Sequence, residues 1–162
     1  MKGGVYMPMS PTVVCNNILK RAFTEGISVT PMKLQKLLYF VSCEYAKQAR
    51  KELFSESFGV WQYGPVLRTV YDEFRSYGGS PIKSYAKDAD GNSYAIDEDT
   101  APNLKRAINR VWDTYKNYSG VALSKITHED GSGWSHAYCQ HRDRITYDDM
   151  RDDTTYVYQM PD

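Results

Sequence analysis

The chain has 162 residues, a length typical of one compact domain that buries its own core without disulfides or a metal. Its 20 lysine and arginine residues equal its 20 aspartate and glutamate residues, so no net charge draws DNA, RNA or anionic lipid from a distance. General nucleic-acid binding is therefore disfavoured.

The cysteines and the N-terminus indicate a cytoplasmic protein. Cys15, Cys43 and Cys139 are widely spaced, which is typical of neither a disulfide framework nor a zinc knuckle. The start of the chain lacks the apolar stretch of a secretion signal, and no segment approaches the roughly 18 apolar residues of a membrane span. We expect no membrane association, a flexible segment over residues 1–9 and a single domain over residues 10–162.

Two helices are expected in the first 50 residues. Ser10-Pro11 combines a good N-cap with proline at the first helical position, and apolar residues recur every four positions until Gly26. Thr30-Pro31 repeats this start signal, and the helix that follows is predicted to be central and to end near Arg50. Its expected apolar face consists of Leu34, Leu37, Leu38, Val41 and Tyr45, with Lys33, Lys36, Glu44 and Lys47 largely off that face.

Extended segments are expected in the middle of the chain. Residues 53–63 form an apolar and aromatic run that is too brief for a helix and favours a short strand. Gly64-Pro65 ends this run, and Pro65 can open a helix that reaches Gly78. Residues 82–96 lose the helical spacing, and their centre at 88–92 is dense in turn residues, so we predict a small β-hairpin there.

The C-terminal part is again predicted to be mostly helical. Apolar spacing indicates a helix from about Pro102 to Ser119-Gly120 and a short helix over 121–126, followed by a glycine-containing loop over 127–134. Residues 155–158 form either a final strand or a turn of helix, and their β-branched and aromatic content favours the strand. The predicted fold class is mainly α: a compact single-domain helical bundle with a short aromatic strand and a small β-hairpin insertion.

All three histidines and one thiol lie within a short stretch near the C-terminus: His128, His136, Cys139 and His141. A zinc site or a cysteine–histidine nucleophile built from them would give a small metal-dependent hydrolase, which is the enzymatic alternative for this chain. Their spacing matches no common structural zinc motif, and no phosphate-binding loop or nucleophile elbow accompanies them. We therefore predict no catalytic residue, no metal site, no cofactor and no enzymatic activity.

The chain is rich in aromatic residues, with 14 tyrosines, 5 phenylalanines and 3 tryptophans. Aromatic side chains provide a large contact area at low entropic cost and are enriched at the energetic centres of protein interfaces. The spacing of Trp61, Phe74 and Trp112 places these three in the core. Candidates for partner-binding residues on the surface are Tyr63, Tyr71, Tyr85 and Tyr94.

Two spaced motifs resemble one protein family, the SocA-like antitoxins, also called the Panacea domain and related to phage-associated GepA proteins. The first motif comprises a helical part, an aromatic part and a second helical part, formed by Lys33, Leu34, Gln35, Leu37, Leu38 and Tyr39, then Trp61, Gly64 and Pro65, then Tyr71 and Phe74. The second motif is the run Leu123-Ser124-Lys125-Ile126-Thr127-His128 with Trp134 a few residues on. A capping role for Thr127 and a loop-locking role for His128 are favoured over proton transfer.

The resemblance implies a mostly helical, non-enzymatic antitoxin that neutralises a toxin by direct protein contact. It also implies a link to the ClpXP protease, because the founding member acts as an adaptor for it. The matched residues are expected to define the fold and a shared binding face. Gly133 departs from the family pattern, where proline more often precedes the tryptophan, and is expected to loosen that loop.

Two questions about partners stay open at this point. A phage or mobile-element accessory protein that binds a host factor would share this fold and surface, so only the identity of the partner separates it from an antitoxin. Association of the chain with a second copy of itself is also open.

Overall fold

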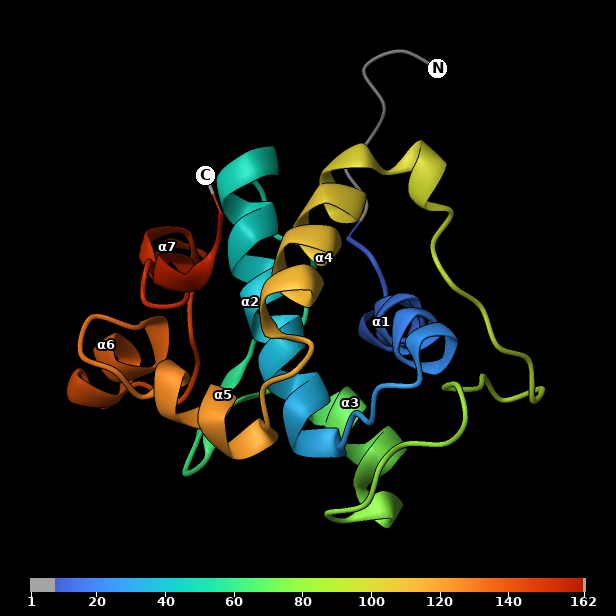
Figure 1. Cartoon of the computed structure of the whole chain (residues 1–162). Helices are drawn as coiled ribbons and strands as arrows, with labels where there is room; N and C mark the ends of the chain where they lie inside the picture. The colour runs from blue at the N-terminus through green and yellow to red at the C-terminus, as the bar shows by residue number, and fades with distance from the viewer. Residues whose placement is uncertain (1–7, 162) are drawn as a thin grey trace.

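The computed structural model describes residues 8–161 and is mainly helical (Figure 1). A flexible segment was expected over residues 1–9; residues 1–7 of it lie outside the described part of the chain. The helices and strands are α1 Pro11–Glu25, α2 Pro31–Ala49, β1 Gly59–Trp61, β2 Gly64–Val66, α3 Arg68–Phe74, α4 Pro102–Tyr115, α5 Gly120–Thr127, α6 Gly133–Cys139 and α7 Tyr147–Asp152, with single 3-10 turns at Arg75–Tyr77, Glu98–Thr100 and Val157–Gln159. No helix within the described range is long and apolar enough to cross a membrane.

The central position of α2 is confirmed, since α4, α5 and α7 pack around it (Figure 1). The prediction that Lys33, Lys36 and Glu44 lie off its buried face is wrong: every residue from Lys33 to Ala46 is buried. Neighbouring elements cover the helix, and its charged side chains bond to the protein instead of solvent: Lys36 to the Pro65 carbonyl, and Glu44 to Arg110 and the Tyr156 hydroxyl. A helix of this kind loses the apolar stripe by which surface helices are recognised.

The strand predicted around residues 53–63 is confirmed as β1, which pairs with β2 in an antiparallel hairpin. Gly59 lies opposite Val66, Val60 opposite Pro65, and Trp61 opposite Gly64. Pro65 was expected to open a helix, but it belongs to β2, and α3 begins three residues later at Arg68. Proline fits this edge position because its missing N–H costs no hydrogen bond there.

The second hairpin, predicted at residues 82–96, is wrong. The turn at its centre forms, with the Asp88 N–H donating to the Asn92 carbonyl over 2.8 Å, but no strands flank it. The Asn16 side chain of α1 instead accepts from the Ala86 N–H and donates to the Ala86 and Tyr94 carbonyls. Asn17 bonds the backbone of Ile96 in the same way. Two asparagine amides thus take the hydrogen bonds that a strand partner would have taken.

Of the two forms considered for residues 155–158, the favoured strand is wrong, and a single 3-10 turn forms at Val157–Gln159. Tyr156 is fully buried and stacks on Phe40 of α2, with ring centroids 5.1 Å apart. Its hydroxyl donates to Glu44 over 2.6 Å. Packing of one tyrosine against the central helix therefore fixes the chain end, and no neighbouring strand is present to pair with it.

Candidate functional site

The polar residues of the first motif attach the hairpin to α2. The Gln35 amide forms two hydrogen bonds with the backbone of Leu67, donating to its carbonyl over 3.1 Å and accepting from its N–H over 2.9 Å. The Lys36 ammonium donates to the Pro65 carbonyl over 3.0 Å. Burial lowers the pKa of Lys36 to about 7, because a charged ammonium is poorly solvated there. These contacts explain why polar side chains occupy a buried helix.

Gly64 lies where the two motifs approach each other most closely. Its φ of +113° is a conformation that favours glycine, and a Cβ at this position would come within 2.7 Å of Thr127 Oγ1 and 3.0 Å of the Lys36 side chain. Thr127 is buried and donates to the Ser124 carbonyl over 2.6 Å. Gly64 is therefore required by both backbone conformation and space.

Three side chains from α5 and its C-terminal neighbourhood hold three consecutive carbonyl groups of the hairpin turn. Trp134 Nε1 donates to the Trp61 carbonyl over 2.8 Å, and Ser124 Oγ donates to the Tyr63 carbonyl over 2.7 Å. Between them, His128 Nε2 lies 2.8 Å from the Gln62 carbonyl. We call Ser124, His128 and Trp134 the turn clamp. It joins the second motif to the first across more than sixty residues of sequence.

His128 is itself fixed on both sides. Its Nδ1 lies 2.6 Å from the Ser124 carbonyl, so each ring nitrogen faces a carbonyl oxygen, and its ring packs on Trp134 with centroids 4.1 Å apart. A second ring, Tyr138, stacks on the other part of Trp134 at 4.9 Å. Both ring nitrogens of His128 are thus occupied by backbone carbonyls, one in α5 and one in the hairpin turn.

The clamped turn presents an exposed aromatic surface, which we call the hairpin face: the side chains of Trp61, Gln62, Tyr63 and Tyr71. Tyr63 is 62% exposed and Tyr71 39% exposed. Trp61 was expected in the core, but it is only partly buried and packs against Tyr71 with ring centroids 5.0 Å apart. The same expectation is confirmed for Phe74 and Trp112, which are both buried.

The four candidate tyrosines do not form one surface. Tyr63 and Tyr71 belong to the hairpin face, whereas Tyr85 and Tyr94 lie in the irregular 82–96 segment, which runs beyond α1 in Figure 1. Tyr85 packs edge-on against Phe23 of α1, with centroids 5.0 Å apart. Their surface is separated from α5 by α1 and α2 (Figure 1).

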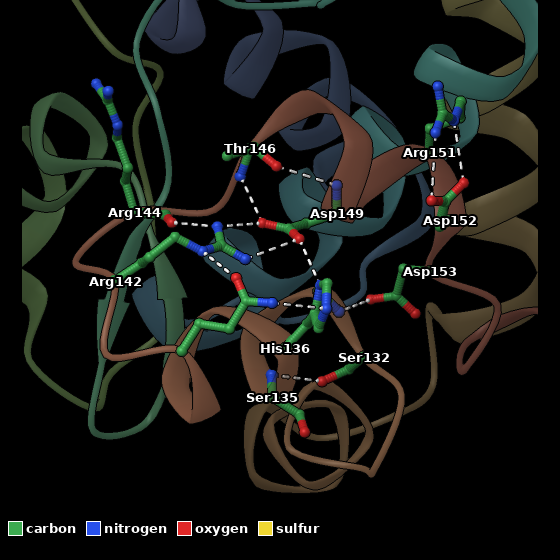
Figure 2. Close-up of polar contacts among 12 residues, drawn as sticks. Ser132, Ser135, His136, Arg142, Arg144, Thr146, Asp149, Arg151, Asp152 and Asp153 are labelled. Carbon is green, nitrogen blue, oxygen red and sulfur yellow. Dashed lines mark hydrogen bonds and ion pairs between the residues drawn. The ribbon is translucent and has the colours of Figure 1, made fainter.

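The histidine and cysteine cluster does not converge on one point. His136 Nδ1 lies 2.8 Å from Asp149, and this carboxylate also receives two hydrogen bonds from Arg142 and one from the Thr146 N–H (Figure 2). Burial alone would raise the pKa of Asp149, but the hydrogen bonds from these groups outweigh it and hold the pKa well below its ordinary value. Asp149 caps α7 and ties it to α6, a structural task.

No three histidine, cysteine, aspartate or glutamate side chains among residues 8–161 gather as a set that could hold a metal ion. His128 faces the hairpin, and His136 faces Asp149. Cys139 and His141 are exposed. The residues of the hydrolase alternative thus do not form a shared site in the described part of the chain.

Comparison with known proteins connects these contacts to a family. The family model described as the SocA-like antitoxin, Panacea domain, matches residues 34–135, from the central helix through the hairpin to the turn clamp. The chain belongs to the SocA-like antitoxin family. The matched region contains the whole hairpin face and all three residues of the turn clamp.

One curated member of the SocA-like family gives a more distant comparison. Antitoxin SocA of Caulobacter vibrioides (strain NA1000 / CB15N) is 28% identical over 124 residues, which make up 75% of this chain and 66% of that protein. The chain therefore spans slightly less than two thirds of its relative. No solved structure matches the chain.

Proposed function

We propose that this SocA-like chain is a non-enzymatic antitoxin whose hairpin face binds and neutralises a partner toxin by direct contact. The observation that carries the proposal is Tyr63, a tyrosine that is 62% exposed on a turn whose carbonyl groups are held on both sides. Exposed aromatic side chains on a rigid support lose little entropy on binding, so more of their contact energy appears as affinity.

Family membership and the related antitoxin from Caulobacter support the same proposal. The hairpin turn carries the motif residues Trp61 and Gly64, and Gly64 permits the backbone path that sets Tyr63 outward. Proposed contact residues are Tyr63 and Tyr71, with Tyr85 and Tyr94 as the candidates on the second surface. A toxin is the proposed partner; a host factor bound by an accessory protein would use the same face.

Co-expression with the product of the neighbouring gene tests the proposal. We expect that product to arrest growth alone, the chain to restore growth, and the two proteins to copurify. Tyr63→Ala should abolish or weaken rescue, whereas Tyr158→Ala, a matched change at a tyrosine that is 79% exposed outside the hairpin face, should keep it. A neighbouring product that is harmless, or toxic without being bound, would contradict the antitoxin role.

The proposal extends to two finer points. The chain acts in the cytoplasm, and it delivers its partner to ClpXP in the manner implied by the family's founding member. Delivery to the protease predicts a separate result: purified ClpXP should degrade the bound partner faster when the chain is present. Unchanged partner turnover would leave neutralisation by contact and remove the adaptor role.

A further inference from the structure

A cavity of about 430 Å³ lies beside the hairpin face, between the N-terminal end of α2 and α3. This volume is within the ~300–1,000 Å³ of sites that enclose a ligand group. Its walls are mostly apolar or aromatic and include Met32, Trp61, Val66, Val70 and Tyr71. A bulky apolar side chain therefore fits its chemistry.

The charges of this cavity have one sign. Lys36 and Arg75 are among its lining residues, all of which lie in the described part of the chain, and no carboxylate is among them. Lys36 is buried, and its ammonium, which has three N–H donors, finds the Pro65 carbonyl as an acceptor in the described structure. Arg75 is exposed, and the Arg68 guanidinium lies 5.8 Å from the Trp61 ring above the same wall. The Arg75 guanidinium can therefore meet a carboxylate of a ligand, and a carboxylate placed near Lys36 would favour the charged form of that ammonium.

We propose that this cavity receives a bulky apolar side chain of the partner together with an adjacent carboxylate, with Arg75 contacting the carboxylate and Lys36 adding positive charge at the cavity floor. The inference rests on the proposed function, because it takes the hairpin face as the partner-binding surface. It adds the chemistry of the partner segment: an aromatic or large aliphatic residue at the C-terminus, which carries that segment's terminal carboxylate.

A matched pair of small probes tests the cavity directly. N-acetyl-L-phenylalanine carries the apolar ring and the carboxylate, and N-acetyl-L-phenylalaninamide replaces the carboxylate with a neutral amide. In two-dimensional NMR titrations of the full 15N-labelled chain, we expect both probes to shift the signals of Met32 and Tyr71, and the acid to bind roughly tenfold more tightly. Arg75→Gln should remove most of that difference, whereas Arg106→Gln, at an exposed arginine of α4, should keep it.

Three results would overturn the inference: equal affinity of acid and amide, shifts confined to residues away from the cavity, or an acid preference that Arg75→Gln leaves intact. Because Arg75 is exposed, its substitution leaves the fold in place. The test is independent of toxin binding. If the cavity binds the acid probe more tightly but the chain neutralises no toxin, only the proposed function is contradicted. If the chain neutralises a toxin but its cavity binds the acid and the amide equally, only this inference is contradicted.

Discussion

At the scale of single residues, Lys36 places an ammonium in the interior of the protein. Its unfolded pKa of 10.5 falls to about 7 on folding because burial disfavours the charged form. Below pH 7 both states are protonated and the full cost of the buried charge is present. Between pH 7 and 10.5 the unfolded state binds more protons, so this cost is relieved as the pH rises.

We therefore predict that Lys36→Met changes the pH dependence of stability. The free energy of unfolding of the variant, relative to that of the natural chain, should be about 2–4 kcal/mol higher at pH 6.5 than at pH 9.5. Loss of the hydrogen bond to Pro65 affects both pH values and does not change this difference. Urea unfolding at the two pH values measures this difference. Lys20→Met, at an exposed lysine of α1, is the control and should give no such difference. The same result for both variants would show that Lys36 is not desolvated.

Gly64 gives a second prediction at this scale. Gly64→Ala should destabilise the fold by more than about 2 kcal/mol, because the new Cβ meets both a positive φ and the side chains of Thr127 and Lys36. Gly91→Ala is the matched control: its φ of +81° carries similar backbone strain, but no atom lies within 4 Å of the added Cβ. Thermal unfolding compares them. Equal losses of stability in the two variants would mean that only backbone strain matters at Gly64. The contact of the added Cβ with Thr127 and Lys36 would then be relieved at little cost.

At the scale of secondary-structure elements, the junction of α6 and α7 depends on Asp149. The pKa of its carboxyl lies below the ordinary 3.8, so its contribution to stability is complete above that pH and is lost as the pH falls below it. Asp149→Asn should cost about 2 kcal/mol at pH 7, and the difference from the natural chain should shrink by pH 3. Denaturant unfolding at both pH values measures it. Asp148→Asn, at an exposed neighbour, should be nearly neutral, and a loss as large as that of Asp149→Asn would argue against the network.

Sequence patterns predict the secondary-structure elements that are determined by interactions between residues close in sequence. Ser10-Pro11 and Thr30-Pro31 start helices α1 and α2, because proline geometry acts within one turn and the Thr30 side chain also caps α2. The hairpin expected at residues 82–96 fails because Asn16 and Asn17, some seventy residues earlier, bind its backbone. Such long-range side-chain contacts leave no mark in local spacing.

The candidate site shows the same division. Thr127, His128 and Trp134 are identifiable from their motif, but their hydrogen bonds to the turn at Trp61–Tyr63 are not, because they join segments distant in sequence. Ser124 completes the clamp; it lies within the second motif, but its bond to the Tyr63 carbonyl has no local signal, since serine is common on helices and at their ends. The partial exposure of Trp61, which its spacing placed in the core, likewise follows from packing.

At the scale of the whole molecule, two exposed aromatic surfaces could meet a partner, and the proposal selects the hairpin face because its turn is held rigidly. Tyr63→Ala and Tyr71→Ala should each weaken partner binding at least roughly tenfold, about 1.4 kcal/mol, while Tyr85→Ala and Tyr94→Ala change it little. Calorimetric titration with the purified partner measures the affinities, and circular dichroism checks that each variant is folded. A loss at Tyr94 as large as the loss at Tyr63 would move the binding surface to residues 82–96, the segment that runs beyond α1 (Figure 1).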